Sequence, residues 1–355
     1  MYLPATYQAA LFLMILSMLC WGSWANTLKL CPGYRFQLFY WDYVMGLALG
    51  AVAWGLTAGS LGDSGAPFWT AVMNTPGNAI AYAICGGIIF NIANLLLVAA
   101  IDVAGLAVAF PVGIGLALIV GTISSYFVHP AANPLLLFGG VALVTIAIIL
   151  DAAAYRKRES SAKATTTRGI VLSLVAGLLM GSFYPLVAHA MAGGEYHLQV
   201  WVHGPQVAVG VIFPGAMALS HPSPYAVALF FSIGVVLSTI PANWLLMKKP
   251  LDGKPSVDGA DYGRAPLRWH IAGILGGFIW CCGAVSNFVA SQAHVSIGPA
   301  VSYSIGQGAT MISACWGVFV WREFAGAPRS AKLLLFFMFL FFLLGLGSIA
   351  LAPLY

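Results

Sequence analysis

Apolar runs long enough to cross a lipid bilayer recur along the whole chain of 355 residues. A helix crosses the hydrocarbon core in about 20 residues, because each residue advances it by about 1.5 Å. Only helices and closed barrels satisfy their backbone hydrogen bonds in lipid, and these runs are continuous rather than alternating as barrel strands are. Charged residues make up 7% of the chain, against about a quarter in soluble domains. The sequence therefore predicts an all-α polytopic membrane protein.

Ten of the apolar runs are long enough to be transmembrane helices. They cover residues 6–28, 39–58, 78–100, 104–127, 133–154, 169–191, 224–247, 269–292, 297–321 and 333–352. A further apolar stretch, residues 206–219, is short for a crossing and contains Pro214, which favours a re-entrant or interfacial segment.

The distribution of Lys and Arg decides between these topologies, because cytoplasmic loops are enriched in both residues. With ten spans, the loops after spans one, five, seven and nine carry all 15 Lys and Arg, and these loops lie on one side. A crossing by 206–219 would move the last eight to the opposite side. We therefore expect ten transmembrane helices and both termini outside the cytoplasm. The basic excess is explained by topology and contact with lipid headgroups, so no nucleic-acid partner is expected.

Two halves of five spans each would enter the membrane with opposite orientation, as in many secondary transporters. The expected repeats are residues 1–154 and 169–355, joined by a cytoplasmic linker at 155–168, with a non-spanning insertion at about 196–221 in the second repeat. The segment AVAFPVGIG at 107–115 is similar to AVSYSIGQG at 300–308, which lies in the equivalent span of the second half. Asn94 and Asn287 each lie eleven residues before an equivalent glycine. These matches support an internal inverted repeat.

Polar side chains inside the spans predict a binding site, because such groups usually face a bundle interior or a cavity. The candidate substrate-binding residues are Trp24, Asn91, Asn94, Asn287, Tyr303 and Gln307. Asn91 and Asn94 share a helix face, as do Tyr303 and Gln307. Their chemistry is uncharged and suits a neutral polar solute, although the alternative is that they only hydrogen-bond one another between helices. Trp24 could stack on a planar ring, whereas anchoring at the membrane interface is favoured for Trp21.

Pro111, in the middle of the fourth span, removes a backbone hydrogen bond. A helix broken at this depth often lines a binding cavity in transporters, and a simple kink is the alternative.

Acidic residues near the spans are candidates for coupling transport to an ion. Asp42, in FYWDY, lies about one turn inside the second span and could carry a coupling proton, unless it reaches back to the interface. Glu323 follows Arg322 at the cytoplasmic end of the ninth span, where an ion pair is the simpler role. No nucleophile and base, phosphate loop, haem motif or regular metal-ligand spacing is found. We expect neither an enzyme nor a cofactor or metal.

Several motifs resemble those of one transporter superfamily. The phrase SACWGVFVWREF (313–324) is similar to helix ends of the drug/metabolite transporter (DMT) superfamily. VGIGLALIVGTI (112–123) resembles a segment of the rhamnose–proton symporters and glucose/ribose porters, and FYWDY (39–43) resembles plant ureide permeases. The resemblance implies a ten-helix alternating-access permease driven by a cation gradient, with its substrate among spans one, three, four, eight and nine.

The expected function is therefore secondary active transport of a small neutral metabolite, such as a sugar or a ureide-like solute, in a plasma membrane or bacterial inner membrane. Coupling to protons or sodium is expected, and membrane lipid is the other partner. The alternatives are a drug or metabolite exporter of the same superfamily, a passive channel, and a membrane sensor that does not transport.

The topology is testable with single-cysteine variants. Lys254→Cys and Arg158→Cys should both react with a membrane-impermeant thiol reagent from the cytoplasmic side, because ten spans place both residues there. Reaction of the two cysteines from opposite sides of the membrane would contradict the ten-span arrangement.

Overall fold

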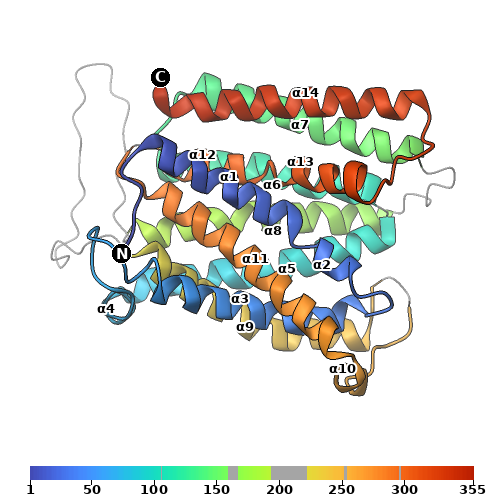
Figure 1. Cartoon of the computed structure of the whole chain (residues 1–355), viewed down its shortest axis with the longest axis horizontal. Coiled ribbons are helices and arrows are strands. Elements are labelled where there is room, and N and C mark those ends of the chain that lie inside the picture. Colours follow the sequence, from blue (N-terminus) through green and yellow to red (C-terminus); the bar gives the residue numbers. More distant parts are fainter. Residues whose placement is uncertain (105, 159–166, 193–221, 252–253, 296) are drawn as a thin grey trace.

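The computed structural model describes residues 1–104, 106–158, 167–192, 222–251, 254–295 and 297–355. These residues form helices and no strand. The helices are α1 (Tyr7–Ser23), α2 (Asn26–Lys29), α3 (Phe36–Leu56), α4 (Phe68–Met73), α5 (Gly77–Ala104), α6 (Leu106–Val128), α7 (Pro134–Arg158), α8 (Thr167–Met191), α9 (Pro224–Lys248), α10 (Ala260–Arg264), α11 (Leu267–Ser291), α12 (Gly298–Gly306), α13 (Ala309–Cys315) and α14 (Arg329–Leu351), with a π-helical turn at Trp316–Val320 and a 3₁₀ turn at Ala352–Leu354. The long helices lie side by side in a bundle (Figure 1).

Seven helices of the described chain are long and apolar enough to cross a membrane. They are Tyr7–Lys29, Gly77–Ile101, Pro134–Arg158, Thr167–Met191, Pro224–Lys248, Leu267–Ser291 and Arg329–Leu354. The other three expected spans correspond to α3, α6 and the α12–α13 pair. The segment 206–219, the insertion at 196–221 and the middle of the expected linker, residues 159–166, lie outside the described residues.

Local sequence signals explain where these helices begin. Pro134 and Pro224 are the first residues of α7 and α9, where a proline costs no intrahelical hydrogen bond and its fixed φ suits the helix. Pro266 and Pro328 stand immediately before α11 and α14. At α1, the Thr6 hydroxyl accepts a hydrogen bond from the Ala9 backbone N–H at 3.3 Å, which satisfies one of the free donors of the first turn.

The expected ninth span, 297–321, is interrupted in the structure. α12 ends at Gly306, a turn at Gln307 and Gly308 follows, and α13 begins at Ala309. Of the two alternatives for Pro111, the broken helix is not observed, because the backbone of α6 is helical through this position. The interruption therefore lies in the second copy of the repeated phrase, at a glycine, which has a low helix propensity.

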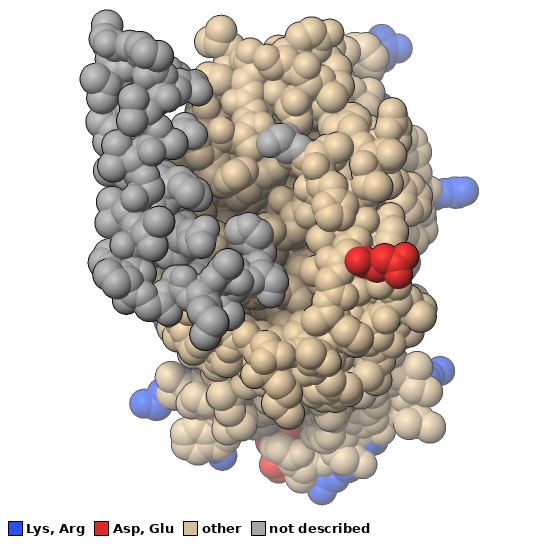
Figure 2. All heavy atoms as spheres, turned by 90° about the vertical axis from the view of Figure 1, so that its left-hand side faces the viewer, with Lys and Arg blue, Asp and Glu red and all other residues tan. Residues whose placement is uncertain are grey.

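The basic residues gather at one end of the bundle. In Figure 1 the described segments that carry Lys and Arg lie at the right-hand end: the α2–α3 connection, the end of α7, the start of α8, the α9–α11 connection and the segment before α14. Both termini lie at the opposite end. Figure 2 views that terminal end, where Lys and Arg side chains are visible only at the margin. We call these the basic end and the terminal end.

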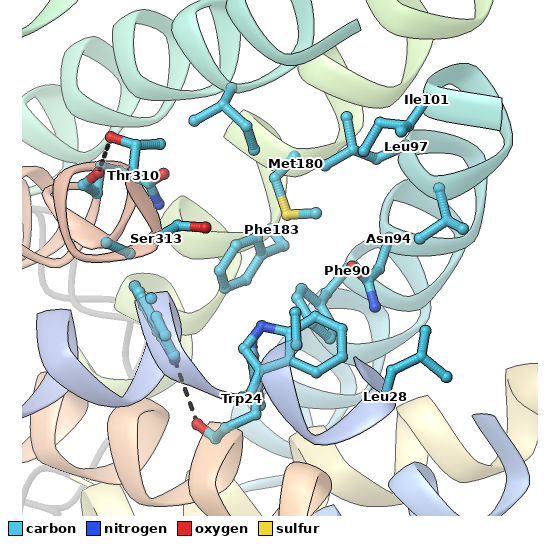
Figure 3. Close-up of a pocket in the computed structure, with 18 of the residues that line it drawn as sticks. Trp24, Leu28, Phe90, Asn94, Leu97, Ile101, Met180, Phe183, Thr310 and Ser313 are labelled. Carbon is cyan, nitrogen blue, oxygen red and sulfur yellow. Dashed lines mark hydrogen bonds between the residues drawn. The ribbon is translucent and has the colours of Figure 1, made fainter. Parts of the chain in front are cut away.

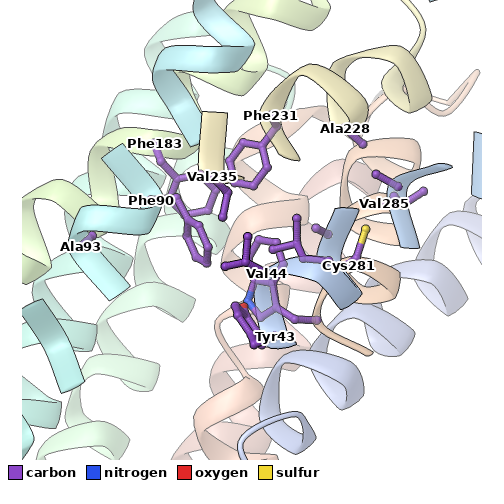
Figure 4. Packing of buried hydrophobic residues seen from close by; sticks show 14 of the residues in the cluster. Tyr43, Val44, Phe90, Ala93, Phe183, Ala228, Phe231, Val235, Cys281 and Val285 are labelled. Carbon is purple, nitrogen blue, oxygen red and sulfur yellow. The ribbon is translucent and has the colours of Figure 1, made fainter. Parts of the chain in front are cut away.

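Helix packing brings distant parts of the chain together. α5 packs on α8 and α9, while α11 packs on α1 and α3. α6 packs on α7, α8 and α12, and α7 packs along α14. Buried aromatic side chains fill the centre between α5, α8, α9 and α11, among them Phe90, Phe183, Phe231 and Trp280 (Figure 4).

Glycines allow two of these helix pairs to touch through their backbones. A Cβ added at Gly277 of α11 would overlap the carbonyl oxygen of Tyr43 in α3, and one added at Gly46 of α3 would overlap Ile274 of α11. The α5–α9 pair has the same arrangement at Gly87 and Gly234. Small residues at such crossings are typical of membrane helix pairs, which associate through close packing.

Gly277→Ala should therefore destabilise the protein, because the new methyl group forces α3 and α11 apart. Overpacking of a close contact costs about 1–3 kcal/mol, which a fall in Tm of the detergent-purified protein would report. Gly139→Ala in α7 is the matched control, since a Cβ there meets nothing within 4 Å. Equal Tm values for the two variants would contradict this account of the α3–α11 contact.

Candidate functional site

A cavity of about 260 Å³ lies between α1, α5, α8, α11 and the α12–α13 interruption. Its volume is slightly below the range of about 300–1,000 Å³ usual for ligand pockets, which suits a small solute. Figure 3 shows side chains from these elements converging on one space.

Aromatic rings form much of the cavity wall. Trp21, Trp24, Phe90, Phe183 and Trp280 all line it. Trp21 stacks on Trp280 with ring centroids 5.9 Å apart, and Phe90 lies 4.3 Å from Trp280. Trp21 is therefore part of the cavity wall, and the expectation that it anchors at the membrane interface was wrong. Flat apolar walls of this kind bind planar molecules by stacking.

Polar groups with unused hydrogen-bonding capacity face the same space. The side-chain amide of Gln307, the hydroxyl of Ser313 and the indole N–H of Trp24 have no hydrogen-bond partner among the described residues. Asn94 donates from Nδ2 to the Tyr40 hydroxyl at 3.1 Å, and its carbonyl oxygen has no partner within the described part of the chain. The cavity thus offers both donors and acceptors to a ligand.

No described residue that lines the cavity carries a charge. Since burying an unpaired charge is costly, the lining disfavours a charged solute. The combination of ring faces, amides and hydroxyls favours a small neutral molecule with several N–H and C=O groups.

The helix interruption explains how Gln307 reaches the cavity. Gln307 still donates its backbone N–H to Tyr303 at 3.0 Å, whereas Gly308 donates to Ile305 at 2.9 Å, so the chain tightens and restarts as α13. Gln307, Thr310 and Ser313 then line one wall together. A broken helix beside a cavity is a common construction in transporters, because backbone irregularity is tolerated where it faces protein or water.

Asn91 lies outside the cavity lining, in a hydrogen-bonded cluster that joins three helices. The Tyr40 hydroxyl donates to Asn91 Oδ1 at 2.7 Å and accepts from Asn94, so the two asparagines share a face as expected. Asn91 also bonds Ser238 at 2.9 Å and Thr239 at 3.2 Å in α9. The cluster holds Asn94 at the cavity wall.

Asn287 and Tyr303 also lie outside the cavity lining. Asn287 bonds the Tyr184 hydroxyl, Ser17 Oγ at 3.1 Å and the Ser302 carbonyl at 2.9 Å. The Tyr303 hydroxyl donates to the Ala117 carbonyl at 3.1 Å. Of the predicted binding residues, Trp24, Asn94 and Gln307 line the cavity, whereas Asn91, Asn287 and Tyr303 bond other groups within the bundle.

The cavity extends from mid-bundle toward the basic end. Along α1 and α2 its lining runs from Trp21 to Leu28, and along α5 from Phe90 to Ile101, near the basic end of each segment. Phe36, the first residue of α3, completes this side. The Asn287 network lies nearer the terminal end. α1 and α12 run from the terminal end toward the basic end, and Ser17 and Ser302 come before the cavity residues Trp21 and Gln307. α11 runs the opposite way, and Asn287 comes after Trp280.

Asp42 is fully buried and is bonded by residues of the α2–α3 connection, α10 and α11. Its carboxylate accepts from Tyr34 at 3.0 Å and from Tyr262 at 2.6 Å, and His270 Nδ1 lies 3.0 Å from both oxygens. The histidine partner belongs to α11, so a basic group does face Asp42 from a neighbouring helix.

Glu323 lies in an ion-pair network at the basic end. Lys29 Nζ is 2.7 Å from Oε1, while Arg158 Nη1 at 3.1 Å and the Tyr155 hydroxyl at 3.0 Å bond Oε2. Burial raises the pKa of Glu323, but the hydrogen bond and charge of Lys29, with Tyr155 and Arg158, outweigh burial and hold the pKa below its ordinary value. The carboxyl is therefore ionised at neutral pH.

Sequence reasoning did not select several residues of these sites. Ser313, Trp280, Phe90 and Phe183 line the cavity, and His270 contacts Asp42. Isolated aromatic and hydroxyl residues in apolar helices are common, so only their convergence marks them. His270 stands close to the start of an apolar run, and a histidine so placed was a signal that could have been followed.

Comparison with known proteins finds similarity to one family of permeases. Residues 39–169 match the ureide permease family. The chain is 24% identical over 387 residues to ureide permease 1 of Arabidopsis thaliana, covering 98% of this chain and 97% of that protein. A solved crystal structure shares the fold, with a TM-score of 0.59 and 14% identity over 95% of this chain and 96% of the other.

The matched family and the matched plant protein are both named as ureide permeases. The long apolar helices are those of a multi-pass integral membrane protein. The chain is thus similar to the ureide permease family over residues 39–169, and to one plant ureide permease over almost its whole length.

Proposed function

We propose that this protein is a secondary active transporter that moves a small neutral ureide-like solute or sugar by alternating access. The observation that carries the proposal is the uncharged cavity with aromatic walls and unused amide and hydroxyl groups. Trp24 stacks on the solute, while Asn94 and Gln307 bond it directly. Asn91, Asn287 and Tyr303 hold the walls in place.

The helix contacts support construction from two inverted repeats, residues 1–154 and 169–355. In this scheme α1, α3, α5, α6 and α7 correspond to α8, α9, α11, α12–α13 and α14. The contacts of α5 with α8 and α9 then correspond to those of α11 with α1 and α3. The α6–α8 contact corresponds to that of α12 and α13 with α1. Such pseudo-symmetry allows one fold to open alternately at either end.

The arrangement of charge supports a cytoplasmic basic end. Both termini would then lie outside the cytoplasm of a plasma or bacterial inner membrane, and the cavity would extend toward the cytoplasm in this conformation.

A cation gradient is proposed to drive the cycle, and Asp42 is the favoured of the two acidic candidates. Glu323 is ionised, and Lys29 and Arg158 occupy both of its oxygens, so a structural tether between the helix ends is its more suitable role. Asp42 is buried between helices and bonded only to groups that do not carry a permanent charge.

A ligand screen followed by transport measurement tests the function. Sugars, ureides and nucleobases are first compared for their effect on the Tm of the purified protein, and a ligand should raise it by binding the folded state. The same ligand should enter proteoliposomes in a saturable, protonophore-sensitive manner. Flux that follows concentration linearly and ignores the proton gradient would indicate a channel instead.

Gln307→Ala and Asn94→Ala should each weaken binding of that ligand about 3- to 10-fold, which corresponds to the loss of one hydrogen bond. Asn287→Ala should lower the Tm, because it removes the buried hydrogen-bond partner of the Tyr184 and Ser17 hydroxyls. Binding is measured by the ligand-dependent Tm shift.

Asn74→Ala is the matched control, since Asn74 is exposed and its amide bonds Thr70 within α4. Wild-type affinity in both the Gln307 and Asn94 variants would remove these residues from the site.

A further inference from the structure

The pair His270–Asp42 at the basic end belongs to no part of the solute cavity and has the features of a proton-binding site. Asp42 has no exposed surface, whereas the His270 side chain is 18% exposed. Nδ1 of the ring faces the carboxylate at 3.0 Å, and Nε2 has no hydrogen-bond partner among the described residues. One edge of the ring is therefore fixed and the other remains open to a proton.

Two tyrosines, Tyr34 and Tyr262, bond the Asp42 carboxylate beside the imidazole. Their hydroxyls donate to Oδ1 and Oδ2, so with Nδ1–H the carboxylate accepts bonds from three sides. The rings of Tyr262 and Tyr34 also pack edge-on against the imidazole, with centroids 4.6 and 6.0 Å away. A carboxylate that receives Nδ1–H fixes the neutral tautomer in which Nε2 accepts the next proton.

Few other titratable groups face this pair. The α2–α3 connection contributes Tyr34 and Cys31, α10 contributes Tyr262, and α11 contributes the exposed Arg268 in the turn before His270. α9, which also packs on α3, contributes the neutral Asn243, bonded to the Gln37 carbonyl at 2.8 Å. Histidine is therefore the one group of this set whose ordinary titration falls between pH 5 and 8.

The pair is mechanically connected to the cavity. Asp42 precedes Tyr43, whose ring lies 4.7 Å from the cavity-lining Trp24. His270 and the cavity-lining Trp280 are on the same helix, α11. Protonation of Nε2 turns the hydrogen bond between a neutral imidazole and the carboxylate into an ion pair, and so strengthens the attraction between α3 and α11.

We propose that His270 accepts the coupling proton at Nε2 and that Asp42 is its positioning residue, a role that rests on the proposed transport function. In this conformation the ring exchanges its proton with water at the basic end, where a proton taken up from the exterior would be released, and the net charge of the pair is zero with the proton bound and −1 without it. The step forms one N–H bond and requires no co-reactant.

The proton site can be tested without a transported solute. In ¹⁵N-histidine NMR of the purified protein, the His270 ring, assigned by its loss in His270→Asn, should titrate between pH 5 and 8. Tyr262→Phe removes a donor that competes for Asp42 and should move the midpoint upward by about 0.5–1 pH unit. A His270 signal that stays constant over this range, or a midpoint unmoved in Tyr262→Phe, would overturn the proton site.

Coupling is tested in proteoliposomes with hydantoin, a cyclic ureide, and a trapped pH-sensitive dye. His270→Asn retains a donor near the position of Nδ1 but cannot titrate. Relative to its own rate of labelled hydantoin exchange, it should lose proton uptake and at least 10-fold of the accumulation driven by an acid exterior. His294→Asn, on the exposed terminal end, is the control and should behave as wild type.

The outcomes separate the two proposals. Proton-driven accumulation that persists in His270→Asn would overturn the role of His270 and leave the transport function standing. A wild-type protein that binds and moves none of the screened solutes would contradict the transport function, while the NMR titration would still decide the proton site. If His270→Asn exchanges no hydantoin, the pH profile of accumulation by Tyr262→Phe decides, because an unshifted profile overturns the proposal.

Discussion

Close backbone contact between helices is the constraint on which the other features of this molecule depend. In lipid, helices gain little from burying apolar faces against one another, so contact distance decides whether a pair is stable. Gly46, Gly273 and Gly277 allow α3 and α11 to approach until the backbones touch. A Cβ at Gly273 would overlap Cβ of Asp42. The contact between His270 and Asp42 therefore depends on glycines that carry no chemistry of their own.

The interruption between α12 and α13, which also contains a glycine, shapes the cavity wall. A continuous helix at 298–315 would satisfy all of its backbone groups internally and present a regular surface to the bundle. The turn at Gln307 and Gly308 instead brings a flexible amide and the start of α13 to the cavity wall. The first copy of the repeated phrase remains a continuous helix. The two halves thus differ at the point where the sequence changes Ile114 to Gln307.

Hydropathy and charge were sufficient to predict a helical membrane protein and most helix positions, because the penalty for polar backbone in lipid leaves few alternatives. The break near Gln307 was not predicted, since Pro111 in the equivalent helix gave the stronger local signal. Trp24, Asn94 and Gln307 were predicted as site residues from polarity and helical spacing, and they do face the cavity. Asn91, Asn287 and Tyr303 have the same local signals but point into hydrogen-bonded networks. Helical spacing shows that two residues share a helix face, but it does not show what that face contacts. The three-dimensional packing is needed to separate the cavity-lining residues from those that bond other helices.

The uncharged lining of the cavity has an electrical consequence. A neutral solute experiences no force from the transmembrane voltage, so under the proposed mechanism the voltage would act on the coupling proton alone. One elementary charge moved through 100 mV corresponds to about 2.3 kcal/mol, or roughly a 50-fold concentration ratio at equilibrium. One proton per cycle would make the carrier electrogenic, and a cell's resting potential alone could then concentrate the solute without any difference in pH.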